Sequence, residues 1–420
     1  MTKTYIKNAT WVLTGEKLDI CLGDGVSVPV INGVILNGAC AASPAGTMEI
    51  PADADVLDAD GELLMPALFD LHAKIDISGK GLRECLNRAD DAAHKGGVCG
   101  MLIMPTASRC FDNGDAIESF ASATRISSET DMYPAGCISL GMEGEQQAPY
   151  NTLKSNGVNI LTDAENVPHN LLMLHRAMKY AAELGLTFAI RGDVPVLTEK
   201  TYMHPGTTSY KLGIHGTPAC AEEIGIETVL RLAADAGAKV HIQTVSTAEG
   251  VAIIRRAKAS GKVQVTAEVA LHHLLYTHEN VGDYDTTFKT LPPLREQSDC
   301  DALLAGVKDG TIDCIVTDHT PCIPFAKKQD FITAPQGMLA LDTFLPALYT
   351  HLVKPGKMTW EEVVRACSLN PVAIAEPTWS NKMLLFDPRT TETVAADTLP
   401  TGTLNTPLLG TELCGSVTML

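Results

Sequence analysis

The chain has 420 residues, 45% of them hydrophobic and 20% charged, enough for a large core in one barrel with an appendage or in about two or three domains. Its formal net charge of −18 argues against nucleic acid or an anionic membrane surface as a partner. No apolar run approaches the roughly 18 residues of a membrane span, and Met1 to Asp19 lack the basic-then-apolar order of a signal peptide. The 12 cysteines form no Cys-x-x-Cys pair, so we expect a cytoplasmic protein in a reducing compartment.

The first part of the chain reads as short β-strands separated by turns that contain Gly and Asp. These strands are expected at Thr10–Thr14, Val26–Ile31, Gly33–Leu36 and Asp55–Asp58. From Met65 onward, apolar strands alternate with amphipathic helices. The predicted strands are Cys99–Met104, Val158–Thr162, Thr187–Arg191, Lys239–Thr244, Val263–Val269 and Asp313–Thr317, and the predicted helices include Leu82–Lys95, Val167–Leu184, Ala219–Ala236 and Thr247–Ser260.

Alternation of strands and helices sustained over ~300 residues favours a (β/α)8 barrel of the TIM type over an open sheet. After Pro377 the pattern becomes β-like again, with a strand expected at Lys382–Phe386. We therefore predict an α/β fold with a barrel over residues 65–377. The flanking segments, residues 1–64 and 378–420, are predicted to form one small β domain together.

Residues 66–74 read as a buried strand that ends in a polar tip. Residues i and i+2 of a strand face the same side, so a His-x-His pair at such a tip can hold one metal ion. Here the second position is Lys74, whose protonated ammonium has no lone pair to offer a metal. A metal ion and a lysine at a ligand position oppose each other electrostatically.

Chemistry in a barrel of this kind is placed at the C-terminal ends of the strands. The polar residues at the predicted ends are His72, Lys74, Asp163, Arg191, Thr244 and Asp318. Three of them can bind a metal, and three are cations or weak ligands. Each one taken alone is most often a hydrogen-bonded structural group, and Asp318-His319 could equally cap a helix or turn. The pair His272-His273 could likewise be packed core, so spacing alone does not support a function.

Several short motifs, in order over ~320 residues, make the chain resemble the dihydroorotases and, more broadly, the cyclic amidases of the amidohydrolase superfamily. The motifs are Pro66–His72, Ala93–Pro105, Thr162-Asp163, His241–Gly250, Val265–Leu275, Pro292–Arg295, Ile315–Pro321, Ala334–Leu341, Asn370-Pro371 and Phe386–Pro388. The resemblance implies a barrel that uses one or two divalent ions, usually zinc, to polarise a ring amide and generate hydroxide.

The resemblance also implies where the functional residues should lie. The His-x-His pair falls on His72 and Lys74, and the bridging carboxylate falls on Asp163. The two later histidines fall on Arg191 and Thr244, and the final aspartate, ligand and general base, falls on Asp318. Three of six ligand positions are therefore substituted. The positions that bind substrate in the family fall on Asp76, Thr106 and Leu291.

Charge balance supports a coherent loss of the metal. Without a cation, Asp163 and Asp318 facing each other would repel, and the pKa of one would rise. We expect Lys74 and Arg191 to replace the two positive charges of a divalent ion and to form a fixed salt-bridge cluster with these carboxylates. Asp318 would then be a vestigial general base in a metal-free site.

The residues and the family resemblance leave three functions open. The first is a non-catalytic dihydroorotase-like protein without a cofactor, a pseudoenzyme that forms a homodimer, for which the resemblance implies a place in pyrimidine biosynthesis and aspartate transcarbamoylase as the candidate partner. The second is a hydrolase of a cyclic amide that uses one zinc ion on His72, Asp163 and Asp318. The third is an enzyme in which Lys74 serves as base or Schiff-base nucleophile. Metal content separates the second from the other two.

Overall fold

The computed structural model describes residues 4–22, 30–31, 34–35, 39–47, 55–377 and 382–420. Both ends of the chain build one antiparallel-rich sheet with the strand order β17-β16-β7-β1-β2-β5, and β6 pairs with β1. Its strands are β1 (Thr4–Trp11), β2 (Lys17–Leu22), β5 (Ala39–Pro44), β6 (Asp55–Asp58), β7 (Leu63–Pro66), β16 (Met383–Thr393) and β17 (Glu412–Met419). Of the expected strands Val26–Ile31 and Gly33–Leu36, only the hairpin of β3 (Val30–Ile31) and β4 (Val34–Ile35) is described; the remaining residues lie outside the described ranges.

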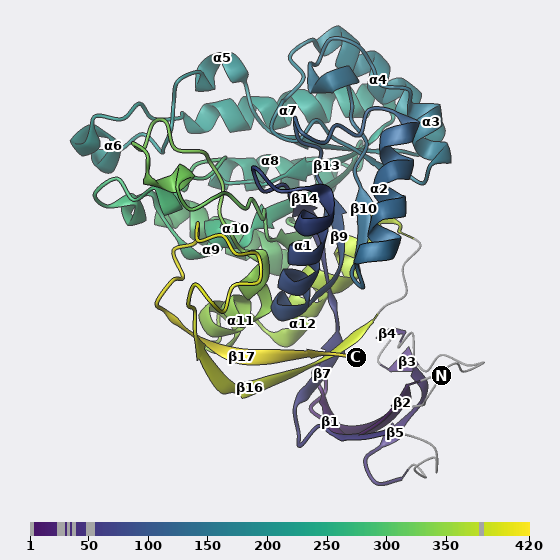
Figure 1. Cartoon of the computed structure of the whole chain (residues 1–420). Helices are drawn as coiled ribbons and strands as arrows, with labels where there is room; N and C mark the ends of the chain where they lie inside the picture. The colour runs from purple at the N-terminus through teal and green to yellow at the C-terminus, as the bar shows by residue number, and fades with distance from the viewer. Residues whose placement is uncertain (1–3, 23–29, 32–33, 36–38, 48–54, 378–381) are drawn as a thin grey trace.

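The two termini meet in this sheet through β16, which pairs with β7 in antiparallel register, Leu384 opposite Met65. Figure 1 shows the yellow C-terminal strands beside the purple N-terminal ones. Alternate residues of the strands, among them Ile6, Trp11 and Leu385, point into a small core of their own. The prediction of one β domain made from both termini is confirmed.

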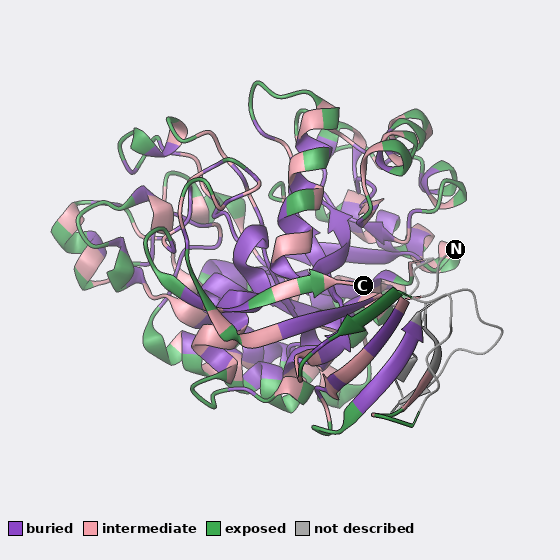
Figure 2. Cartoon of the chain, turned by 60° about the horizontal axis from the view of Figure 1, so that its bottom comes forward, coloured by how far each residue is buried: buried purple, intermediate pink, exposed green. Residues whose placement is uncertain are grey.

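The barrel consists of β8 to β15, all parallel. The strands are β8 (Leu68–Ala73), β9 (Val98–Ile103), β10 (Asp131–Pro134), β11 (Ile160–Leu161), β12 (Thr187–Arg191), β13 (Lys239–Gln243), β14 (Gln264–Ala270) and β15 (Cys314–Val316). Single bridges close the ring, from Gly136 to Leu161 and from Ala73 to His319. The predicted (β/α)8 barrel is confirmed, with helices covering strands that are buried on both faces (Figure 2).

The outer helices follow the strands in chain order. They are α1 (Leu82–Gly96), α2 (Gly114–Ser127), α3 (Tyr150–Ser155), α4 (Leu171–Leu184), α7 (Ala219–Ala236), α8 (Ala248–Ser260), α10 (Gln297–Asp309), α11 (Phe344–Leu348), α12 (Trp360–Val364) and α13 (Asn370–Ala375). Shorter pieces in the loops are α5 (Pro195–Thr198), α6 (Thr207–Leu212), α9 (Leu271–Leu275), η1 (Leu140–Met142), η2 (His278–Val281), η3 (Thr286–Phe288), η4 (Ala326–Lys328) and η5 (Leu341–Thr343). Two π-helical turns, η6 (Tyr349–Val353) and η7 (Arg365–Leu369), extend α11 and α12.

Local chemistry explains where the predicted bounds differ. The helix expected from Val167 begins only at Leu171, because the Asn170 side chain caps it by accepting a hydrogen bond from the Met173 amide at 3.1 Å. The strand β10 was missed because it has four residues and ends in proline. At the end of α1, a Cβ on Gly96 would lie 1.8 Å from the Leu341 carbonyl oxygen, so glycine allows helix and η5 to touch.

Among the described helices, none combines the length and the apolarity needed to cross a bilayer.

Candidate functional site at the barrel mouth

The predicted strand ends meet around a cavity of about 10 Å³ at the C-terminal side of the barrel. Its lining residues are His72, Lys74, Ala164, Glu165, Arg191, Gln243, Thr244, Leu291 and Asp318. Five of the six predicted site residues are among them, and Asp163 is not. A cavity needs roughly 10–15 Å³ to hold one water molecule, so side chains nearly fill this mouth.

The Lys74 ammonium contacts the Glu165 carboxylate, which sequence reasoning did not single out. Lys74 is buried, whereas 49% of the Glu165 side chain is exposed. The pKa of Glu165 is lowered, first by the Lys74 charge, with Arg191 contributing as well. The lysine at the second histidine position is therefore held by a local carboxylate.

Asp163 faces away from this pair. Its carboxylate accepts hydrogen bonds from the Ile138 amide at 2.8 Å, the Ser139 amide at 3.1 Å and the Ser139 hydroxyl at 2.5 Å. Burial raises the pKa of Asp163 to about 6 despite these bonds. Asp163 therefore fastens the 138–139 loop, and the expected contact with Lys74 is wrong. The reason is the left-handed backbone of Ala164, with φ 51°, which breaks the strand alternation between residues 163 and 165.

Arg191 is also paired locally. Its guanidinium Nη2 donates to the Glu165 carbonyl at 3.2 Å and to Asp193 Oδ2 at 3.3 Å. The expected cluster, in which Lys74 and Arg191 hold Asp163 and Asp318, is replaced by two ion pairs, which are linked by the hydrogen bond from Arg191 to the Glu165 carbonyl. These are Lys74–Glu165 and Arg191–Asp193.

The retained histidine, His72, lies in a buried hydrogen-bonded cluster with Glu268 and His241. Its Nδ1 lies 2.5 Å from Glu268 Oε1, and His241 Nε2 lies 3.0 Å from Glu268 Oε2. Burial is the largest single influence on the pKa of His72 and would lower it, but the charge and hydrogen bond of Glu268 and the charge of Asp318 together outweigh burial, and the pKa is raised. Burial would raise the pKa of Glu268, yet His72 and His241 lower it to about 2. Sequence reasoning missed Glu268, although an acidic residue inside a buried apolar strand is a usable signal.

Asp318 completes this part of the mouth. Its two oxygens lie 3.6 Å from His72 Nε2 and 3.7 Å from His272 Nε2, beyond hydrogen-bond distance. Burial raises the pKa of Asp318 to about 6, opposed by the charges of His72 and Lys74. Asp318 and Thr244 have φ of 48° and 44°, like Ala164 in the left-handed region. Non-glycine residues held there cost roughly 1–3 kcal/mol each and gather at functional sites.

The mouth does not fit a zinc ion. Zinc in proteins takes three or four nitrogen, sulfur or oxygen ligands, and of the family's set only His72 and Asp318 converge here. Ala164 offers no ligand atom, and the Lys74 ammonium repels a cation. In residues 55–377, no trio of histidine, cysteine and carboxylate atoms at the mouth lies within 4.8 Å of one another.

The positions that resemble the family's substrate clamp are bonded to each other. Asp76 accepts hydrogen bonds from the Thr106 hydroxyl and, at 2.5 Å, from Arg109 Nη2. Backbone hydrogen bonds between Thr106 and Arg109 form an isolated antiparallel β-bridge, and the Arg109 side chain therefore lies beside Asp76. Sequence reasoning missed Arg109, because a two-residue turn, residues 107–108, determines its direction. Leu291 lines the mouth cavity and adds an apolar wall.

Comparison with known proteins agrees with this architecture. A family model described as "Dihydro-orotase-like" matches residues 61–250. The dihydroorotase of Pelotomaculum thermopropionicum is 37% identical over 378 residues, 88% of each chain, and that of Mycobacterium leprae is 34% identical over 410 residues, 94% of each.

Solved structures show the same fold. The L-hydantoinase (dihydropyrimidinase) from Arthrobacter aurescens superposes with a TM-score of 0.82 at 18% identity, covering 100% of this chain and 95% of that one. The dihydropyrimidinase from Brevibacillus agri gives 0.77 at 21%, covering 100% and 93%. The barrel, the small β domain and the long curated matches lead to one conclusion. The chain belongs to the dihydroorotase-like family of the amidohydrolase superfamily.

Proposed function

We propose that this dihydroorotase-like chain lacks metal-dependent hydrolysis and serves as a non-catalytic subunit linked to pyrimidine biosynthesis. The observation that carries the proposal is the Lys74 ammonium at the second histidine position, in contact with Glu165. A divalent ion beside this ammonium meets strong repulsion at short range. The cavity of about 10 Å³ also leaves no space for a six-membered substrate ring, because ligand pockets usually measure roughly 300–1,000 Å³.

Turnover measured in both directions tests this proposal. The purified chain is assayed for dihydroorotate hydrolysis and for cyclisation of carbamoyl aspartate, with and without added zinc, beside the dihydroorotase of Pelotomaculum thermopropionicum as the active control. We expect no rate above background for this chain. A zinc-dependent rate that Asp318→Asn abolishes would contradict the proposal.

A second candidate is hydrolysis of a cyclic amide, with one zinc ion on His72, Asp163 and Asp318. The comparisons taken alone favour it over the first, since eight curated relatives at 31–37% identity are named dihydroorotase. The left-handed backbone of Thr244 and Asp318 also favours a site kept for ligand binding. It requires Asp163 to give up its bonds to the 138–139 loop and the Lys74–Glu165 pair to open. Protection of Lys74 from an amine-reactive reagent by dihydroorotate would support it.

The proposed partners follow from the first reading. In a chain retained without catalysis, selection acts on a surface that binds another protein. We therefore propose a cytoplasmic homodimer that binds aspartate transcarbamoylase. Light scattering after size-exclusion chromatography, with the chain alone and with the transcarbamoylase of the same organism, measures both. A monomer that neither binds nor alters that enzyme would remove the subunit reading.

A further inference from the structure

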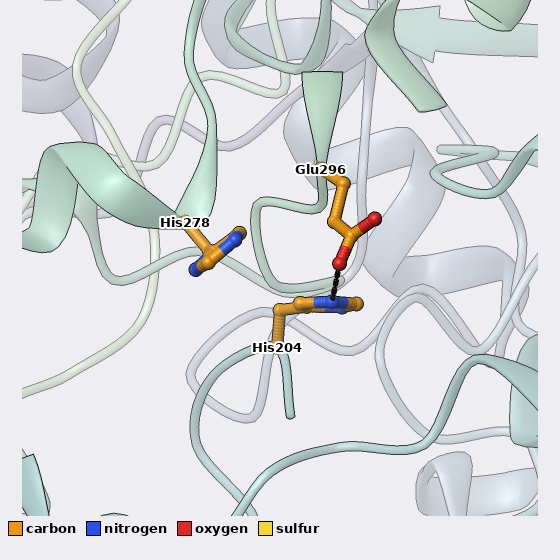
Figure 3. Close-up of side chains that lie close together, drawn as sticks. All are labelled: His204, His278 and Glu296. Atoms are coloured by element: carbon orange, nitrogen blue, oxygen red, sulfur yellow. Dashed lines mark hydrogen bonds and ion pairs between the residues drawn. The ribbon is translucent and has the colours of Figure 1, made fainter. Parts of the chain in front are cut away.

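Outside the mouth, three side chains from separate loops meet on the C-terminal side of the barrel. His204 lies in the loop between α5 and α6, His278 begins η2, and Glu296 directly precedes α10. Figure 3 shows the two imidazoles near each other, with a dashed line from a Glu296 carboxylate oxygen to a nitrogen of His204. One ligand atom from each of the three lies within 4.8 Å of the others, and none of the three lines the mouth cavity.

The distance between His204 and Glu296 fits a shared metal ion as well as it fits a long hydrogen bond. His204 Nε2 and Glu296 Oε1 are 3.4 Å apart, longer than the ~2.7–3.2 Å of a good nitrogen–oxygen hydrogen bond. Two ligands bound tetrahedrally at about 2.0–2.1 Å are separated by about 3.4 Å. The His204 and His278 ring centroids are 4.9 Å apart and one ligand atom of each lies within 4.8 Å, so His278 must turn towards His204 to complete the site.

Both imidazoles are buried, and burial favours the neutral, metal-binding form of His204. His204 is 9% exposed and His278 is 7% exposed, and His204 faces the Glu296 carboxylate with its Nε2 atom. Burial, followed by the charges of Arg295 and His278, lowers the pKa of His204, so the ring is neutral near pH 7. Neutral imidazole is the form that binds metals. The Glu296 side chain is 57% exposed, which leaves one side of the trio open to solvent.

The nearby Arg295 guanidinium opposes a cation, but it is held by other groups and faces a carboxylate of its own. Its Nη1 donates to the Thr217 carbonyl at 2.7 Å and its Nε donates to the Ser246 hydroxyl at 3.1 Å. The Glu222 carboxylate lies 4.0 Å from Nη2 and offsets the charge.

We propose that His204, His278 and Glu296 bind one divalent transition-metal ion of the zinc class, with a fourth position open to water. Two imidazoles and one carboxylate are a donor set that suits zinc. The bound ion links the loop after β12, which carries His204, to the segment between β14 and α10, which carries His278 and Glu296. The site is independent of the mouth and of the proposed function.

Zinc chloride titrated calorimetrically into the chelator-treated full chain tests the site. The wild type and the control variant His215→Ala, which changes an exposed histidine between α6 and α7, are expected to bind one ion each. His204→Ala and His278→Ala are expected to bind at least ~100-fold more weakly, because each loses a direct ligand. Co²⁺ provides a second readout, since a tetrahedral site gives visible absorption that both variants should lack.

Glu296→Gln keeps the proposal testable if a histidine variant does not fold, because its exposed side chain can be changed without disturbing the core. Binding by Glu296→Gln as tight as that of the wild type would overturn the proposal. Equal binding by His204→Ala would overturn it too, as would wild-type binding only at millimolar zinc. Loss of bound zinc in His72→Ala but not in His204→Ala would place the ion at the mouth, and this outcome would support the hydrolase reading instead.

Discussion

Replacing Glu268 by glutamine is expected to destabilise the fold more than any charge removal on the surface. Glu268 is fully buried, and its two carboxylate oxygens each form a hydrogen bond with a histidine, Oε1 with His72 and Oε2 with His241. The substitution keeps the shape of the side chain but removes the charge that two buried imidazoles face. Removing one member of a buried ion pair costs ~3–5 kcal/mol, because the remaining charge is left without compensation.

The pKa of Glu268 gives an independent magnitude. It falls from its ordinary value of 4.5 to about 2, and at ~1.4 kcal/mol per pKa unit this corresponds to ~3 kcal/mol. The raised pKa of His72 reflects the same attraction and is not added. The Glu268 contribution is complete above pH 4.5 and is lost as the pH falls towards 2. The His72 contribution is complete below pH 6.5 and is lost as the pH rises through its raised folded pKa.

Thermal unfolding followed by circular dichroism at pH 6, within both windows, measures the effect. At ~2 °C per kcal/mol, Glu268→Gln should melt about 6 °C below the wild type. Glu183→Gln on the exposed face of α4 is the matched control, and we expect it within ~0.5 kcal/mol of the wild type. The difference in melting temperature between Glu268→Gln and the wild type should become smaller as the pH rises beyond the folded pKa of His72.

A double-mutant cycle with His72→Gln isolates the pair. The coupling between the two substitutions is expected to be ~2–3 kcal/mol, in the upper part of the range for contacting residues. A melting temperature for Glu268→Gln equal to that of Glu183→Gln, with no coupling to His72, would refute the buried hydrogen-bonded cluster.

Four further outcomes follow from the structure. Lys74→Ala should cost only ~1 kcal/mol, since its partner Glu165 is half exposed and can be solvated, and a loss of several kcal/mol in urea unfolding would show a more closed pair. Lys74→His alone should not start dihydroorotate hydrolysis, because Arg191 and Thr244 remain, and an assay with added zinc checks this. Asp163→Ala should lower stability by ~1–3 kcal/mol, as measured by urea unfolding, because the Ile138 and Ser139 donors lose their acceptor. Zinc should raise the melting temperature of the chelator-treated wild type and His215→Ala but not of His204→Ala, through binding to the folded state alone.

The sequence by itself determined the architecture and the position of the candidate site. Strand and helix periods are local properties, so the alternation from Met65 to Pro377 predicted the barrel, and the β-like flanks predicted the shared domain. Because parallel strands end at one face of a barrel, the sequence alone places the strand ends that carry His72, Lys74 and Asp318 together. The sequence also showed directly that Lys74, Arg191 and Thr244 stand where the family resemblance places histidines.

Only the tertiary structure decided which charge meets which. The left-handed Ala164 directs Asp163 into the 138–139 loop and leaves Glu165 to hold Lys74. Glu268 reaches His72 across 196 residues of sequence, and Glu296 reaches His204 across 92. Such pairings depend on single backbone torsions and on loops that fold back over the barrel, and neither leaves a periodic pattern in the chain.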